Sequence, residues 1–399
     1  MDLFKNVVSL CKRRGFVFQT AEVYGGARSL YDFAHLGYLL KYNIAEYWIK
    51  NLMFNHEDIL FLDGTILLPY QVVKASGHVD NFADPMVDCK VCRHRFRPDK
   101  VEKELGELKC PICGSKSLTD IKFFNLMFKT SLGPVERIDE LVDFVLDNSH
   151  LDRASLKKLV NQKLVEESVY LRPETAQSIF SQFLNLSRCY PKKLPFGIAQ
   201  IGKAFRNEVT TEKFLFRVAE FEQMEVEFFI KPETEQQWFD FWIQERFAWW
   251  RKILNDGQNL RIRHYDQSEL AHYASRCADI EFKFPWGFDE VEGIASRTDF
   301  DLSSHEAGSG KEHSVFEHFT DGDKTKAVKI KPWVIEPSCG LTRAFLAVLL
   351  DAYSEEEGKD ATGETKIRTF LRLKPFLSPI KVAVLPLVKN DKLINFGKR

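Results

Sequence analysis

Four cysteines form the most specific chemical pattern in the sequence. Cys89 and Cys92 make one Cys-x-x-Cys pair, Cys110 and Cys113 make a second, and residues 93–109 separate the two pairs. This arrangement is typical of a tetrahedral zinc site, with disulfides or a chance pattern as the alternatives. Four cysteine ligands leave no open position on the metal, so we expect a structural Zn2+ and not a catalytic one.

A second group of polar residues lies at the ends of apolar segments. Arg206, Asn207 and Glu208 follow the apolar run 196–205, and Phe216-Arg217 begins another. A planar guanidinium suits a phosphate, and a carboxylate accepts hydrogen bonds from an amino group. Residues two apart on a strand share a face, so Arg206 and Glu208 are expected to point the same way. A cross-sheet ion pair is the alternative to a ligand site.

Several carboxylates fall within or beside apolar segments, where an unpaired charge is costly. They are Glu174, Glu222, Glu225 and Glu290. We expect them either to hold an amine or Mg2+, or to pair with nearby arginines.

The segment 336–343 reads as a strand end, a glycine and a helix start. A helix N-terminus attracts anions, and Arg343 in the first turn adds a fixed positive charge there. Because arginine is disfavoured at a helix start, its presence indicates a functional role.

Regular elements must position these residues. Apolar spacing predicts a long amphipathic helix over 36–54, a buried aromatic helix over 236–254 and a helix over 342–353. The runs 59–62 and 66–68 indicate a strand pair with a tight turn at Asp63-Gly64. Three strands are expected between 195 and 230, one or two surface helices over 135–169, and a buried strand over 380–388.

Composition excludes several classes of protein. The chain has 399 residues, is 44% hydrophobic and 28% charged, and carries a net charge of -1, so it is neither disordered nor globally basic. No apolar run is long enough to cross a membrane, and the first residues lack the features of a secretory signal. We therefore expect a cytoplasmic protein with no membrane partner.

Taken together, these segments resemble the class II aminoacyl-tRNA synthetases. FRNE at 205–208 with FRVAEFEQME at 216–225 is similar to motif 2, GLTR at 340–343 to motif 3, and the long helix with Pro69 to motif 1, the dimer-forming element. A finer resemblance is to glycyl-tRNA synthetases of the dimeric type. It rests on VYGG at 23–26, KASGHVDNF at 74–82, FRPD at 96–99, FNLMFKTSLGPVE at 124–136, LRPETAQSIF at 171–180, GIASRTDFDL at 293–302 and EPSCGLTR at 336–343.

The resemblance implies an α+β fold, with an antiparallel sheet flanked by helices. It implies a catalytic domain over 1–378, with a zinc-ribbon-like insertion at 87–118 and a helical insertion at 135–169. Residues 379–399 resemble the first strand of the family's anticodon-binding domain. We expect 389–399 to be poorly ordered, and 380–388 to pack on the core or to be mobile.

The resemblance also implies an activity: ATP-dependent ligation of glycine to tRNA(Gly) through a glycyl-adenylate, by a homodimer that uses Mg2+. Arg206, Glu208 and Arg343 are the implied catalytic residues. The implied ATP-binding residues are Arg206, Asn207, Glu208, Phe216, Arg217, Phe221, Glu290, Val291, Gly340, Leu341, Thr342 and Arg343. The implied glycine-binding residues are Arg97, Glu174, Phe221, Glu222, Gln223, Met224, Glu225, Glu336, Pro337, Ser338, Cys339 and Gly340.

Two features depart from the family pattern in motif 2. Ala219 replaces an arginine, and Thr210-Thr211-Glu212-Lys213 replaces a more basic turn, so both changes remove positive charge. A non-catalytic nucleic-acid-binding paralogue, and an enzyme that activates glycine without efficient tRNA charging, are the competing interpretations. Retention of Arg206, Glu208 and Arg343 argues against the first.

Overall fold

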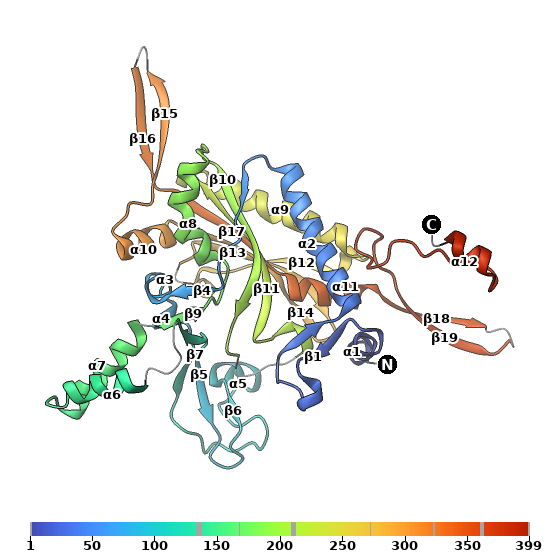
Figure 1. Cartoon of the computed structure of the whole chain (residues 1–399), viewed down its shortest axis with the longest axis horizontal. Coiled ribbons are helices and arrows are strands. Elements are labelled where there is room, and N and C mark those ends of the chain that lie inside the picture. The colour runs from blue at the N-terminus through green and yellow to red at the C-terminus, as the bar shows by residue number, and fades with distance from the viewer. Residues whose placement is uncertain are drawn as a thin grey trace.

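The chain folds around a seven-stranded sheet, seen at the centre of Figure 1. A computed structural model describes residues 2–132, 138–166, 168–208, 213–271, 273–321, 324–359 and 363–397. The strand order is β12-β13-β14-β17-β11-β10-β3, and every neighbouring pair is antiparallel except β10 with β3. The strands are β3 (Ile59–Phe61), β10 (Phe196–Phe205), β11 (Glu220–Ile230), β12 (Leu260–His264), β13 (Arg276–Phe284), β14 (Gly287–Thr298) and β17 (Trp333–Gly340).

Helices cover one face of this sheet, because alternate residues of its strands are apolar. Met224, Val226 and Phe228 of β11 are buried in the main core with α1 (Leu3–Arg14), α2 (His35–Asn55), α9 (Glu235–Ile253) and α11 (Leu341–Ala352). Trp242, Trp249 and Trp250 of α9 are fully buried there, so the aromatic helix is a core element. The expected antiparallel sheet flanked by helices is confirmed.

The opposite face of β11 is polar at one end and apolar at the other. Phe229 packs in a second core with α8 (Ala176–Cys189) and Leu302 of α10 (Phe300–Ser309). Gln223, Glu225 and Glu227 lie on the same face of β11, nearer to its start. The polar half of this face forms the floor of the site described below.

Smaller elements surround the sheet. The helices are α3 (Tyr70–Ala75), α4 (His78–Asn81), α5 (Pro98–Leu105), α6 (Ile138–Asp147), α7 (Arg153–Glu166) and α12 (Asp391–Gly397). The strands are β1 (Val17–Gln19), β2 (Tyr31–Phe33), β4 (Leu67–Pro69), β5 (Ala83–Asp88), β6 (Arg95–Phe96), β7 (Lys122–Asn125), β8 (Lys129–Ser131), β9 (Ser168–Leu171), β15 (Val315–Asp321), β16 (Lys324–Ile330), β18 (Tyr353–Lys359) and β19 (Thr365–Leu371).

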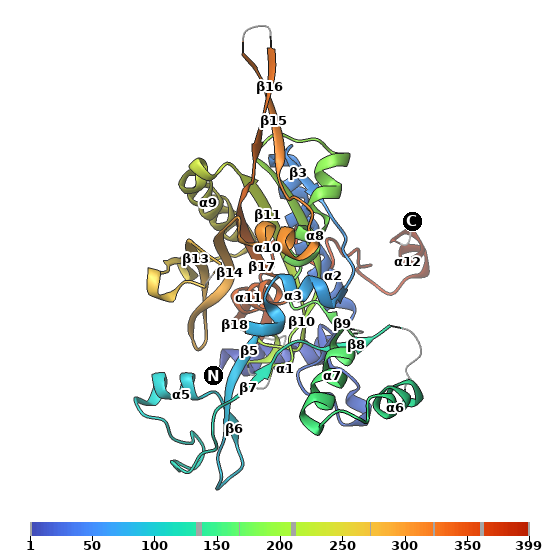
Figure 2. The same ribbon diagram turned by 90° about the vertical axis from the view of Figure 1, so that its left-hand side faces the viewer.

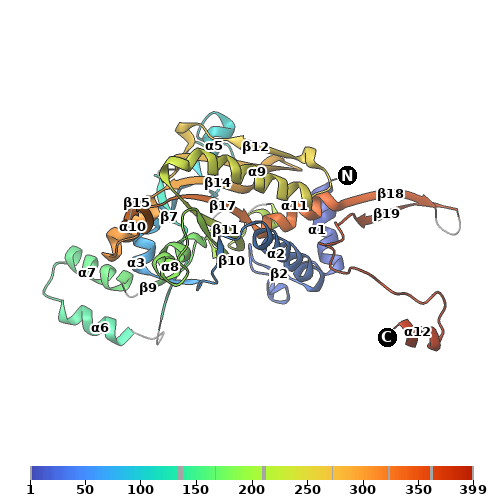
Figure 3. The same cartoon turned by 90° about the horizontal axis from the view of Figure 1, so that it is seen from above.

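Four of these units project from the body. The β15–β16 hairpin and the β5–β7 region with α5 extend from opposite ends (Figures 1 and 2). The α6–α7 pair and the β18–β19 hairpin extend on opposite sides in Figure 3. The expected block 135–169 therefore contains two helices, but its last residues already belong to β9, and 135–137 lie outside the described residues. Within the described part of the chain, no helix is long and apolar enough to cross a membrane.

Two expectations about strands are wrong. The runs 59–62 and 66–68 do not pair with each other, because β3 joins β10 in the main sheet and β4 joins β9 in a smaller one. Residues 214–216 form a short 3-10 helix, and residues from 220 onward form one continuous strand to Ile230. Short apolar runs indicate burial but do not identify the strand that will pair with them.

The C-terminal segment does not form the buried strand expected over 380–388. Residues 380–388 form no strand and expose their apolar side chains, with Leu387 97% exposed, so this segment does not pack on the core. The following residues, expected to be poorly ordered, include helix α12. Among the residues that the structure describes, no strand pairs with this segment, and a single unpaired strand is not stable in water.

Candidate active site

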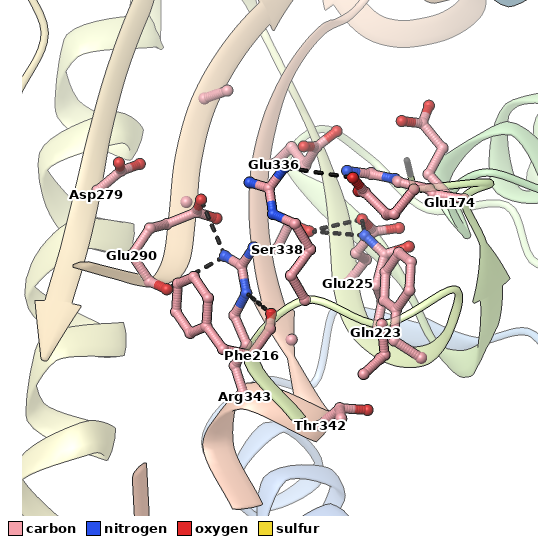
Figure 4. Close-up of a pocket in the computed structure, with 18 of the residues that line it drawn as sticks. Glu174, Phe216, Gln223, Glu225, Asp279, Glu290, Glu336, Ser338, Thr342 and Arg343 are labelled. Carbon is pink, nitrogen blue, oxygen red and sulfur yellow. Dashed lines mark hydrogen bonds and ion pairs between the residues drawn. The ribbon is translucent and has the colours of Figure 1, made fainter. Parts of the chain in front are cut away.

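A cavity of about 270 Å³ opens on the polar face of the sheet (Figure 4). Its floor comes from β11, β14 and β17, and its rim from the residues after β9 and β10 and from the first turn of α11. The expected residues that line it are Glu174, Arg206, Glu208, Phe216, Arg217, Phe221, Gln223, Glu225, Glu290, Glu336, Ser338, Gly340, Thr342 and Arg343. Segments far apart in the sequence therefore supply a single concave surface.

Four arginines line this cavity, and two of them, Arg206 and Arg343, come from separate parts of the chain. Arg206 follows β10, its Nε donates to the carbonyl of Pro173 at 3.0 Å, and its guanidinium lies 5.3 Å from the centre of the Phe221 ring. Arg343 begins α11 and donates from Nη1 to the backbone oxygen of Glu290 at 3.2 Å, with the Glu290 carboxylate at 3.1 Å. Figure 4 shows the Arg343 guanidinium held beside Glu290 and Phe216. Both groups are thus positioned to meet an anion.

Glu208 forms an ion pair, which was the alternative to a role in ligand binding. Strand β10 ends at Phe205, so Arg206 and Glu208 lie just beyond it, yet both side chains line the cavity. The Glu208 carboxylate accepts from Nη1 of Arg217 at 3.3 Å. This ion pair is part of the cavity wall, so the carboxylate is held in place by the pair and still faces the cavity.

Buried acids occupy the other end of the cavity. The Glu225 carboxylate accepts from Gln223 at 2.7 Å and from Ser338 at 2.6 Å, and Thr175 also donates to it. Arg297 donates to Glu336 at 2.6 Å and lies 4.0 Å from Glu174. These side chains are 15% exposed or less where they pair, so the charges are largely removed from water.

Burial and neighbouring charges shift the pKa values of these acids in different directions. Although burial raises the pKa of Glu174, the charges of His78 and Arg297 outweigh it and hold that pKa below the ordinary value. Burial and the charge of Glu174 raise the pKa of Glu225. Burial raises the pKa of Glu336 to about 8, although Arg297 opposes this shift. Carboxyl groups outnumber the single buried arginine at this end of the cavity, and a cation bound there would favour the charged forms of Glu225 and Glu336.

Asp279 and Glu290 lie near the Arg343 end of the cavity. Both carboxylates approach Gly293, since a Cβ built there would lie 3.6 Å from Asp279 Oδ1 and 3.9 Å from Glu290 Oε1. Tyr265 donates to Asp279 at 2.6 Å. Burial and the charge of Glu290 raise the pKa of Asp279 to about 7.

This shift predicts a stability effect with a definite sign. Because the folded protein binds the Asp279 proton more tightly than the unfolded chain, the stabilisation from this group is complete below about pH 4 and is lost as the pH rises through about 7. Asp279→Asn is therefore expected to reduce the fall in the free energy of unfolding between about pH 5 and pH 8, measured by urea denaturation. Asp147→Asn on α6 is the control and should leave the pH dependence unchanged. An unchanged pH dependence in Asp279→Asn would contradict the assignment.

Several expected site residues have side chains outside the cavity. The strand alternation explains most of them, since positions between cavity-facing residues point into the main core or away from the site. Met224, Val291, Cys339 and Leu341 are buried in the core, and Glu222 pairs with Lys41 at 2.7 Å. Pro337 and Asn207 do not line the cavity. Arg97 lies before α5 and pairs with Asp84 at 2.7 Å and Asp99 at 2.6 Å. The runs predicted from 221 to 225 and from 336 to 340 therefore contribute only some of their side chains to the cavity.

Other cavity residues were not expected from the sequence. They are Leu215, Val218, Tyr273, Cys277, Asp279, Gly293, Ala295 and Arg297. Arg297 is the most important, because it is 3% exposed and contacts three acids from separate elements. The GIASRTDFDL run at 293–302 was the available signal, since it contains both Arg297 and Asp301, but no local pattern identifies the other partners, Glu174 and Glu336. Residues 209–212, which include the unusual Glu212, lie outside the described residues, and Ala219 only contributes backbone bonds, to Ser29 and Arg206.

The four cysteines meet in the β5–β7 region. Their sulfur atoms all lie within 4.8 Å of one another, with Cys89 and Cys113 at 3.6 Å and Cys92 and Cys110 at 3.4 Å. Four sulfurs bound tetrahedrally to zinc at about 2.3 Å lie roughly 3.8 Å apart, so the observed spacing fits this metal. No other group of three or more potential ligands meets this criterion in the described ranges.

Comparisons with known proteins agree with this fold. Residues 159–353 match the family model described as the tRNA synthetase class II core domain (G, H, P, S and T). A Giardia lamblia prolyl-tRNA synthetase in complex with prolyl-adenylate has a similar fold, with a TM-score of 0.59 and 15% sequence identity over 95% of this chain and 56% of that chain. The fold is therefore that of a class II aminoacyl-tRNA synthetase.

Curated relatives define the family more narrowly. The glycine–tRNA ligase of Treponema denticola is 45% identical over 395 residues, which is 99% of this chain and 80% of the relative. That of Borrelia hermsii is 44% identical over 401 residues, 100% of this chain and 82% of the relative. The chain belongs to the glycine–tRNA ligase family.

Proposed function

We propose that this protein activates glycine with ATP and transfers it to tRNA(Gly). The observation that carries the proposal is a single cavity lined both by Arg206 and Arg343 and by a group of buried acids that outnumber Arg297. An anionic nucleotide and a small ammonium compound can meet in such a cavity, and their reaction forms an aminoacyl-adenylate. Membership of the family specifies glycine as the amino acid.

Arg206, Glu208, Phe221 and Arg343 would bind ATP. Arg206 would contact the α-phosphate, Glu208 would accept from the adenine amino group, and Phe221 would stack on the adenine ring. Arg343 would hold the γ-phosphate of a bent triphosphate. The fixed guanidinium groups would neutralise the charge that develops during in-line displacement of pyrophosphate, so positioning and electrostatics would supply the catalysis.

The acid end would bind glycine. Glu174, Glu225 and Ser338 would surround the ammonium group, and the buried pairs around Arg297 would fix the acids in position. The glycine carboxylate would point toward the α-phosphate beside Arg206. Because glycine lacks a side chain, filling the space of a Cβ excludes every other amino acid, and alanine should be activated far less well.

Mg2+ would arrive with ATP. Glu290, joined by Asp279, supplies carboxylate oxygen atoms on the same wall of the cavity, and oxygen atoms are the ligands that Mg2+ prefers. Bound there, the ion would neutralise phosphate charge. The Glu290 carboxylate also pairs with Arg343 at 3.1 Å, so a metal ion held by Glu290 would lie close to the proposed γ-phosphate site.

Further assignments follow from the family. We propose that the protein is a cytoplasmic homodimer, with the long helix α2 and the strands after it in the dimer-forming element. Residues 1–378 would form the catalytic domain, with the insertions 87–118 and 135–169. The terminal adenosine of the tRNA would enter the cavity to accept glycine.

We also propose that Cys89, Cys92, Cys110 and Cys113 bind one structural Zn2+. The expected result is a zinc content near one per chain in the purified protein, falling to near zero in Cys110→Ser, because three ligands bind zinc far more weakly than four. Elemental analysis measures the metal. Cys189→Ser is the control, since Cys189 is exposed and lies outside the cluster. A metal-free protein of unchanged stability would contradict the assignment.

Two assays test the function. Glycine-dependent exchange of pyrophosphate into ATP should be robust, and alanine should support almost none. Charging of tRNA(Gly) with labelled glycine then tests transfer. No exchange with any amino acid would favour a non-catalytic nucleic-acid-binding protein, and exchange without charging would limit the activity to glycine activation.

A further inference from the structure

A second layer of buried polar groups lies behind Glu174. His305 comes from α10 and Gln177 from α8, two helices that pack together beside the sheet (Figure 1). His305 is 6% exposed and Gln177 is fully buried. Nε2 of His305 lies 2.8 Å from Oε1 of Gln177. Neither residue lines the active-site cavity, so any effect on the reaction must pass through Glu174 or its neighbours.

The amide of Gln177 has only one suitable orientation. Its Nε2 donates to Glu174 Oε1 at 3.0 Å and to Asp301 Oδ1 at 3.0 Å. A flipped amide would direct its carbonyl oxygen at two carboxylates and leave both without this donor. The carbonyl oxygen of Gln177 can only accept, so the His305 ring must carry a proton on Nε2.

The protonation state of His305 is consistent with an N–H donor at Nε2. Burial lowers the pKa of His305 to about 4, so the ring is neutral at physiological pH and has one N–H. That N–H is committed to Gln177, which prevents the amide from flipping. The hydrogen bond from His305 therefore holds the neutral amide of Gln177 between Glu174 and Asp301 without adding a charge.

Gln177 connects two parts of the acid end. Glu174 lines the cavity directly, and Asp301 accepts from Arg297 at 2.7 Å and 3.0 Å. Arg297 in turn holds Glu336. A loss of orientation at Gln177 would consequently disturb both the carboxylate that faces the substrate and the arginine that holds its neighbour.

We propose that His305 is a positioning residue for the amino-acid substrate, which acts by holding Gln177 so that Glu174 presents its carboxylate to the ammonium group. This inference rests on the proposed function, because it takes the ammonium of glycine as the group that Glu174 binds. His305 would thus affect the recognition of glycine without contacting it.

Two amide substitutions at His305 test the inference. Glutamine can place an amide nitrogen where Nε2 lies, whereas asparagine reaches only as far as Nδ1 and loses the bond to Gln177. His305→Asn is expected to raise KM for glycine about tenfold in the exchange assay, with KM for ATP and kcat within about twofold. His305→Gln is expected to keep KM for glycine within about threefold of the unaltered protein.

A neighbouring histidine provides the control. His313 is 4% exposed and its ring centre lies 6.3 Å from that of His305, but its Nδ1 contacts the backbone oxygen of Lys311 and not Gln177. His313→Asn should leave KM for glycine unchanged, even if the melting temperature falls. In a Gln177→Leu background, His305→Asn should have no further effect on KM, because its route to Glu174 is already removed.

The outcomes are distinguishable. An unchanged KM for glycine in His305→Asn, or an equal loss with ATP and glycine, would overturn the positioning role and leave the proposed function intact. An additional effect in the Gln177→Leu background would also overturn it. If the unaltered protein shows no glycine-dependent exchange, the proposed function fails and the positioning role fails with it.

Discussion

Arg343→Ala is expected to lower kcat/KM for glycine-dependent pyrophosphate exchange about 10³-fold or more, as removal of a cation that stabilises a transferring phosphoryl group does in other enzymes. Arg343 occupies the first turn of α11, and its side chain is held by the backbone oxygens of Phe216 and Glu290. These bonds fix the guanidinium before substrate binds, so little reorganisation is needed. Alanine removes the charge from the place where we propose that the γ-phosphate lies.

Arg343→Lys is the matched control for this effect. Lysine keeps the charge but not the fork geometry, so we expect activity between that of the alanine variant and that of the unaltered protein. Unfolding curves should show that both variants are folded under assay conditions. An alanine variant that is folded and retains near-normal exchange would contradict the phosphate role.

Arg297→Met is expected to lower the free energy of unfolding by about 3–5 kcal/mol, the usual range for removing one partner of a buried ion pair. Arg297 contacts Asp301, Glu336 and Glu174, and methionine would leave these acids without their cation. Loss of the nearby positive charge raises the pKa values of these acids. They then take up protons, which removes the cost of burying unpaired charges. Because a raised pKa gives stability that is lost as pH rises, the deficit should be larger near pH 8 than near pH 5.

The comparison uses denaturant unfolding at both pH values. Arg276→Met is the control, because Arg276 is an arginine on the neighbouring strand that is 44% exposed and pairs with Glu235 at 3.6 Å. Such an exposed pair is worth about 1 kcal/mol or less. Equal losses for the two variants, or a deficit at Arg297 that does not grow with pH, would show that Arg297 is not the counter-ion of the acid cluster.

Local patterns predicted the parts of this protein that depend on local geometry. Each Cys-x-x-Cys pair brings its two sulfurs together within one turn of the chain. The spacing between the two pairs is typical of a zinc site, and all four sulfurs lie together in the structure. The aromatic spacing in 236–254 predicted a buried helix, and α9 has nearly these bounds. The family resemblance predicted the antiparallel sheet and the motifs that line the cavity.

Features that depend on residues distant in the sequence, such as strand pairing, could not be predicted from local patterns. The run 59–68 gave no indication that its two strands belong to different sheets. Carrying motif residues over as unbroken runs ignored the alternation of a strand, so Met224 and Cys339 were included although they lie in the core. Arg297 was missed because two of its three acid partners, Glu174 and Glu336, are distant in the sequence, and only folding brings them to it.

A crystal structure of the protein with glycine and a non-hydrolysable ATP analogue tests the proposed site most directly. We expect a bent triphosphate in the cavity, with Arg206 at the α-phosphate, Arg343 at the γ-phosphate and the glycine ammonium between Glu174 and Glu225. A nucleotide bound elsewhere, or one contacted by neither arginine, would contradict this expectation.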